Sequence, residues 1–159
     1  MRTPASIAGH PIHPMVVPLA IGGFLLSFVF DIVCMVTGAT DPWASVAYYT
    51  MIGGIVGALI AAVFGLIDLI SLPAGHVKRV GYTHMGINLF IVALFMCNAL
   101  MRHDETGGNL PYWLSGIGVA LLVVSGWLGG KMVYEASVGV SGGEMIGGER
   151  RATNRRIEV

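Results

Sequence analysis

Three of the five histidines in this chain stand where they could bind a cofactor together. His10 and His13 lie in the run His10-Pro11-Ile12-His13-Pro14, directly before a long apolar segment, and His84 opens another such segment. Imidazoles from two parallel helices can hold a haem iron from both faces without covalent attachment, and they can equally bind a chlorophyll-type magnesium. We therefore predict that a b-type haem or another tetrapyrrole binds to His10, His13 and His84, with Tyr134 at the same site.

Two other kinds of ligand suit the same residues, and the sequence leaves them open. His13, His84 and Asp68 form a mixed nitrogen and oxygen set that suits Zn²⁺ or Fe²⁺. The same groups suit a quinone head-group site, in which histidine and aspartate relay protons while Tyr134 or a tryptophan stacks on the ring. Each interpretation requires these side chains to meet at one end of their helices.

The sequence lacks the common catalytic motifs. It contains no nucleophile elbow, phosphate-binding loop or zinc-protease motif, so we predict no catalytic residues. Cys34 and Cys97 lie inside apolar segments, and the absence of a Cys-x-x-Cys-His motif excludes covalently attached c-type haem. The predicted chemistry is therefore ligand binding.

The composition indicates a membrane protein. Of the 159 residues, 55% are apolar and only 11% are charged, and the formal net charge is zero. A soluble chain of this length needs more charge to keep its surface in water. The composition excludes nucleic-acid binding through a basic patch and a disulfide-stapled secreted domain, so we expect a lipid bilayer around the chain.

Four long apolar segments predict an all-α, polytopic membrane protein. They cover about residues 15–37, 48–72, 83–101 and 112–133, and each is long enough to cross a hydrocarbon core of about 30 Å. They are apolar around the whole helix, unlike the helices of a soluble bundle. Their short connections predict an antiparallel bundle of four transmembrane helices in residues 15–134, with an arm (1–14) before it and a flexible basic tail (135–159) after it.

The basic residues predict the orientation of the bundle. All but one of the nine lysines and arginines fall on the side that holds both termini and the second connection, and only Arg102 falls on the other side. The positive-inside rule therefore places both termini in the cytoplasm. The residues expected at the cytoplasmic membrane edge are His10, His13, Asp68, His84 and Tyr134. Asp31 lies near the opposite edge and does not join them.

The 23 glycines indicate close helix packing. Small residues let helices approach one another within a bilayer. The second segment carries Gly53, Gly57, Ala61 and Gly65 on one face, and the fourth carries Gly126 and Gly130. We expect these faces to pack within the chain, and they are also the predicted seams for other membrane subunits or for a second copy.

Several of these residues resemble the pattern of a bacterial membrane family known as domain of unknown function 2231. The likeness is carried by Gly9-His10-Pro11-Ile12-His13-Pro14-Met15, Gly65-Leu66-Ile67-Asp68, His84 with Asn88, Ser125-Gly126-Trp127-Leu128-Gly129-Gly130 and Val133-Tyr134. It covers about residues 9–140 and implies four helices in a bacterial inner membrane, with no established reaction. The family commonly has a histidine soon after the tyrosine, where this chain has Ala136. If that histidine is a ligand in relatives, this chain has one ligand fewer.

Together these features predict a non-catalytic membrane protein. We expect a subunit or electron-transfer component of a larger energy-transducing membrane complex, with a b-type haem as its most specific ligand. The alternative is a metal- or quinone-binding membrane enzyme or a small transporter. Nucleic acid is not an expected partner, because the chain has no basic surface of the required extent.

Overall fold

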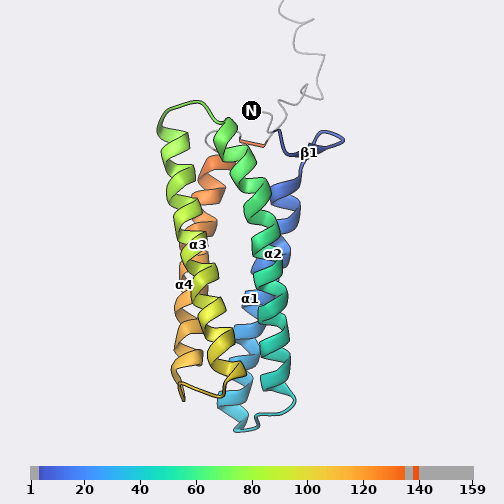
Figure 1. The fold of residues 1–159 in the computed structure, drawn as a ribbon, viewed down its shortest axis with the longest axis vertical. Helices are drawn as coiled ribbons and strands as arrows, with labels where there is room; N and C mark the ends of the chain where they lie inside the picture. The colour runs from blue at the N-terminus through green and yellow to red at the C-terminus, as the bar shows by residue number, and fades with distance from the viewer. Residues whose placement is uncertain (1–3, 135–137, 140–159) are drawn as a thin grey trace, which may run out of the picture.

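The chain folds as an antiparallel bundle of four long helices (Figure 1). The structure is a computed structural model that describes residues 4–134 and 138–139. Its elements are β1 (Ser6–Ile7), β2 (His10–Pro11), α1 (Ile12–Thr37), α2 (Trp43–Ser71), α3 (His76–His103) and α4 (Leu110–Tyr134). Each helix is long and apolar enough to cross a membrane. The all-α, four-span prediction is therefore confirmed, and most of the predicted tail lies outside the described residues.

The helices extend beyond the predicted apolar segments, most clearly in α3. His76 and His103, which sequence analysis leaves outside the third segment, are the first and last residues of this helix. His84 does not open the helix but lies about two turns inside it. Hydropathy finds the apolar middle of a span, whereas backbone hydrogen bonding continues into the polar boundary of the membrane.

Two helix pairs pack most closely, α1 with α2 and α3 with α4, while α2–α3 and α1–α4 contacts close the ring. The first pair is close because glycines face each other: a Cβ on Gly23 would lie only 2.6 Å from Cα of Gly54. The helices α1 and α3 are thus diagonal to one another. The molecule is two helix hairpins placed side by side.

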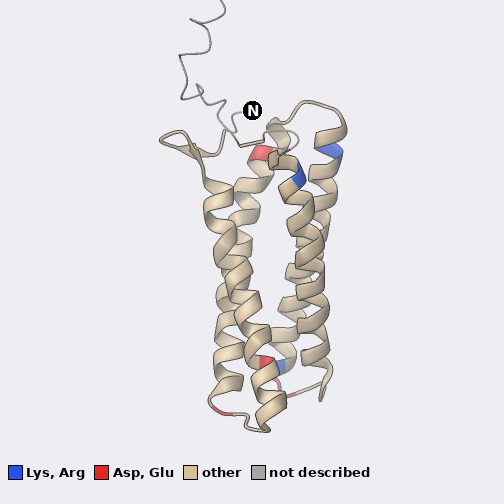
Figure 2. Cartoon of the chain, turned by 180° about the vertical axis from the view of Figure 1, so that it is seen from behind, with Lys and Arg blue, Asp and Glu red and all other residues tan. Residues whose placement is uncertain are grey.

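Charged residues of the described chain lie at the two ends of the bundle, and its long middle has none (Figure 2). Large apolar side chains are exposed along the middle of all four helices, among them Leu26, Val63, Phe90 and Val123. Exposed apolar surface of this extent between two charged ends fits the hydrocarbon layer of a bilayer.

The predicted N-terminal arm folds back on the bundle as a short hairpin. Its strands β1 and β2 pair antiparallel, and the turn between them has positive φ at Ala8 (51°) and Gly9 (81°). The buried residue Ala5 donates its backbone N–H to Oδ1 of Asp68, at 3.0 Å. The arm is therefore attached to the last turn of α2. We call this end of the bundle the arm end, and the other the far end.

Candidate functional site

A cavity of about 390 Å³ lies between the four helices in the half of the bundle next to the arm. Most of its lining is aliphatic, and Phe24 on α1 marks its deepest level. Its polar and charged lining side chains are His13, Asp68, His84, Asn88 and Ser125. A concave, mostly apolar space with a few polar groups has the character of a small-molecule site.

His13, in the first turn of α1, is fixed by the neighbouring helix α2. Its Nδ1 lies 2.8 Å from the backbone carbonyl oxygen of Ala61. Because a carbonyl oxygen only accepts hydrogen bonds, Nδ1 must carry the proton and donate it, which leaves the lone pair on Nε2. The ring rests against Gly65, where an added Cβ would be 2.9 Å from Cε1. In the described part of the chain, Nε2 of His13 has no hydrogen-bond partner.

His84 on α3 is held in the same way by α4. Its Nδ1 donates to the carbonyl oxygen of Ser125 at 3.0 Å, and its ring rests against Gly129, where an added Cβ would be 3.2 Å from Cε1. The amide nitrogen of Asn88 lies 3.2 Å from Nε2. That nitrogen has only two hydrogens and closer acceptors for both, the Ser125 hydroxyl at 2.6 Å and the His84 carbonyl at 2.8 Å. Nε2 of His84 is therefore the most distant of the three acceptors around this amide and keeps its lone pair.

The two imidazoles thus lie on opposite walls of one cavity, on diagonal helices. His13 lies against Gly65, about one and a half turns before the end of α2, and His84 lies against Gly129, about one and a half turns before the end of α4. Their depths in the bundle are therefore similar. Two lone pairs at one depth on facing walls suit a ligand that is held from both sides.

The structure brings together only part of the predicted site. His13, His84 and Asp68 line the cavity, whereas His10 and Tyr134 do not. His10 is exposed in the hairpin, with Nδ1 3.1 Å from the Ala8 carbonyl oxygen, and Tyr134 is 88% exposed. The short β2 strand turns His10 away from the bundle.

Asp68 is almost buried, at 8% exposure, and its carboxylate accepts the Ala5 N–H of the arm. Within residues 4–134 and 138–139, no three His, Cys, Asp or Glu side chains stand close enough together to hold a metal ion. His13, His84 and Asp68 line one cavity at separate points of its wall. In this structure the Asp68 carboxylate binds the arm.

Asn88 and Ser125 are polar cavity residues to which sequence analysis gives no role, although both stand in the segments that carry the family resemblance. Asn88 donates to the Ser125 hydroxyl and so links α3 to α4 beside His84. The available signal is spacing, because Asn88 follows His84 by about one turn and shares its helix face.

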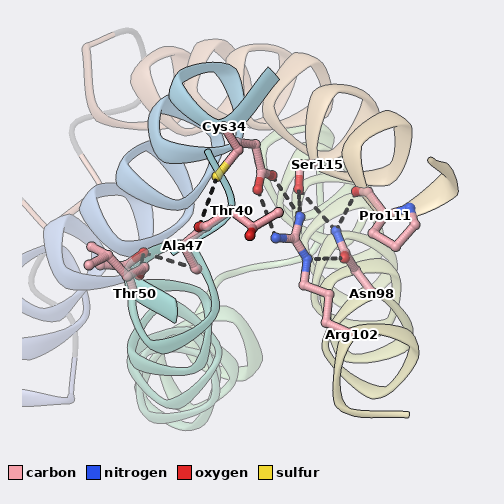
Figure 3. A network of polar contacts seen from close by, with 10 residues as sticks. Cys34, Thr40, Ala47, Thr50, Asn98, Arg102, Pro111 and Ser115 are labelled. Atoms are coloured by element: carbon pink, nitrogen blue, oxygen red, sulfur yellow. Dashed lines mark hydrogen bonds and ion pairs between the residues drawn. The ribbon is translucent and has the colours of Figure 1, made fainter. Parts of the chain in front are cut away.

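A second polar cluster lies at the far end (Figure 3). Arg102 on α3 makes two hydrogen bonds of 2.7 Å to the carboxylate of Asp31 on α1, and its Nε donates to Oδ1 of Asn98 at 2.8 Å. Ser115 on α4 accepts from both Arg102 and Asn98. The sequence predicts both Asp31 and Arg102 near this end, and the structure adds their pairing, which a buried membrane carboxylate needs. The cluster joins α1, α3 and α4.

The predicted small-residue face of α2 is used inside the chain over most of its length. Cβ atoms added at Gly57 and Gly65 would meet α1, at Leu19 and His13. Added at Gly53 or Gly126, they would meet nothing within 4 Å. Close packing within the bundle therefore accounts for part of the predicted seam, while Gly53 lies on an open face and Gly126 lines the cavity.

Comparison with known proteins identifies the family of this chain. A family model described as "Predicted membrane protein (DUF2231)" matches residues 9–142, which includes all four helices. No curated protein and no solved structure matches the chain. The matched region contains both cavity histidines, Asp68 and the far-end pair. The chain is an integral membrane protein and belongs to the DUF2231 family of predicted membrane proteins.

Proposed function

We propose that this protein is an electron-transfer component of the membrane that holds one b-type haem, or a related tetrapyrrole, between His13 and His84. The observation that carries the proposal is the state of the two imidazoles. Each donates Nδ1–H to a backbone carbonyl of the neighbouring helix and keeps its Nε2 lone pair on the wall of the same cavity.

This arrangement is the usual support of a metal-binding histidine. A histidine that binds a metal through one ring nitrogen almost always donates its other N–H to a carbonyl or carboxylate, which fixes the tautomer and the direction of the ring. Histidines on facing helices of a four-helix bundle can supply both axial ligands of a haem iron. The aliphatic lining suits the macrocycle, and the bound iron would supply one-electron chemistry.

The excess of basic residues at the arm end supports a cytoplasmic position for the site, with the chain in a bacterial inner membrane. We further propose that the protein works as a subunit of a larger energy-transducing complex. The open face at Gly53 is a surface available for such docking. Co-purification of other membrane subunits in mild detergent tests this part, and a monomer under the same conditions contradicts it.

The absorption spectrum of detergent-purified protein tests the haem proposal. We expect a Soret band, either as isolated or after addition of hemin, and its loss in His13→Ala and His84→Ala. His10→Ala is the matched control, because His10 is the histidine of the same run that lies outside the cavity. A preparation that stays colourless with hemin, while circular dichroism shows folded helices, refutes the proposal.

A quinone is the second candidate, favoured by the polar groups beside His84. The Asn88 amide, the Ser125 hydroxyl and the imidazole meet at one place on an otherwise aliphatic wall, which suits a membrane-soluble ring with oxygen substituents. Solvent extraction of the purified protein, followed by chromatography, tests for it. A quinone present in wild type and lost in His84→Ala, without any Soret band, selects this function over the first.

A further inference from the structure

The residues that form the cavity and the contacts beneath it occur in pairs, with one member of each pair on α1 and the other on α3. His84, Phe95 and Arg102 each follow their counterparts His13, Phe24 and Asp31 by the same 71 residues. Members of each pair have matching places: the histidines line the cavity, the phenylalanines stack on one another, and Asp31 binds Arg102.

Residues of α4 also correspond to residues of α2, and these pairs again share one constant separation in the sequence. Phe24 lies against Gly54 and Phe95 lies against Gly118, where added Cβ atoms would be 2.8 Å and 2.6 Å from the rings. The carbonyls that fix the histidines, and the glycines on which the rings rest, follow the same correspondence. The hairpins α1–α2 and α3–α4 are therefore two copies of one structural unit, related by a pseudo-twofold axis along the bundle.

On this axis the diagonal helices α1 and α3 meet at two levels. The rings of Phe24 and Phe95 stack with centroids 4.0 Å apart and an interplanar angle of 6°. Below them, Arg102 donates hydrogen bonds to both carboxylate oxygens of the fully buried Asp31. The Arg102 side chain is itself only 13% exposed. Both contacts join equivalent positions of the two copies, so α1 and α3 stand in register with no relative shift along the axis.

That register decides whether the two imidazoles face each other. His13 and His84 are separated from the ion pair by the same number of residues, or about 27 Å of helix at about 1.5 Å per residue. A slip of one residue between α1 and α3 would move one ring by about 1.5 Å relative to the other. A slip of this size would therefore leave the two Nε2 atoms at different depths on the cavity wall.

We propose that Asp31 and Arg102 are positioning residues for the cavity: their ion pair holds the two structural repeats in register, so that His13 and His84 present their Nε2 atoms at one depth. The identity of the ligand rests on the proposed function, but the register does not. The bidentate geometry suits this role, because two parallel bonds fix direction as well as distance.

Cross-linking in native membranes tests the register without any ligand. Val17 and Asn88 are equivalent positions of the two repeats on the cavity wall, and Met85 lies about one turn from Asn88 on the same wall. In a Cys34→Ala, Cys97→Ala background, we expect a short bis-maleimide to link V17C to N88C more efficiently than V17C to M85C. In Arg102→Gln this preference should fall several-fold, and the charge swap D31R/R102D should restore it.

A change in the ratio of the two cross-links reports register, whereas general loosening lowers both together. Ser45→Ala is the matched control at the same end, because Ser45 bonds only the exposed Asp41 and lies away from the axis. An unchanged ratio in Arg102→Gln, or a ratio that the charge swap leaves low, overturns the proposal.

A second readout separates this proposal from the haem assignment. If haem binds, Arg102→Gln should change a low-spin, two-histidine spectrum to a high-spin one, and D31R/R102D should reverse the change. If no haem binds and the cross-link ratio still shifts, the proposed function fails and the positioning role stands. If haem binds and neither readout responds to Arg102→Gln, the positioning role fails alone.

Discussion

Replacing Arg102 by methionine should destabilise the bundle more than any other single change at the far end. The substitution keeps an unbranched apolar stem but leaves Asp31, which is 0% exposed, without its donors, and Asn98 Oδ1 without its Arg102 bond. Removing one partner of a buried ion pair typically costs about 3–5 kcal/mol, because the remaining charge is buried without compensation. We expect a loss in that range.

The reverse change and the double change complete the experiment. Asp31→Asn should cost less, because the Arg102 side chain is partly exposed at the end of α3 and can extend toward the membrane boundary. Asp31→Leu combined with Arg102→Met removes both charges, and such apolar replacements of a buried pair are often neutral or stabilising by about 1–4 kcal/mol. The double variant should therefore recover most of the loss seen in Arg102→Met.

Unfolding titrations in mild detergent, followed by tryptophan fluorescence and circular dichroism, measure these differences. The result that refutes the reasoning is a double variant less stable than Arg102→Met, since this would mean that the cost does not come from an uncompensated buried charge. Equal losses in Arg102→Met and Asp31→Asn would contradict the argument from exposure.

Three further outcomes follow from the packing. Gly65→Ala should destabilise by about 1–3 kcal/mol through overpacking against an imidazole ring, whereas Gly126→Ala, with open space around it, should be neutral or slightly stabilising in the same titration. Asp68→Ala should release the N-terminal arm, seen as faster proteolytic cleavage within residues 4–11 while the helices stay intact, and unchanged cleavage would argue against the Ala5 bond as the attachment. Phe24→Ala should cost about 3–5 kcal/mol by opening a cavity in the stack, whereas Phe90→Ala on the exposed surface should leave stability within about 0.5 kcal/mol of wild type.

The number and position of the spans could be predicted from the sequence because a bilayer imposes length and apolarity directly. The rotation of each helix could not, since helices that are apolar all round carry no stripe that marks an inner face. His13 and His84 were therefore predicted as candidates, but their carbonyl partners Ala61 and Ser125 were not.

His10 was predicted as a site residue, but the structure places it outside the cavity. It stands three residues before His13 in a conspicuous motif, yet a hairpin of two-residue strands turns it away from the cavity. Strands this short leave no alternating pattern to detect. The Asp31–Arg102 pair could have been predicted from the sequence, because both residues were expected near the same membrane edge and an isolated buried charge is costly there.

The duplication has a consequence for assembly. If two first hairpins from different molecules met face to face, Asp31 would oppose Asp31, and two second hairpins would bring Arg102 against Arg102. Like charges buried together are strongly unfavourable, so identical halves reject each other and each accepts only the unlike half. The opposite charges therefore favour the pairing of a first hairpin with a second hairpin.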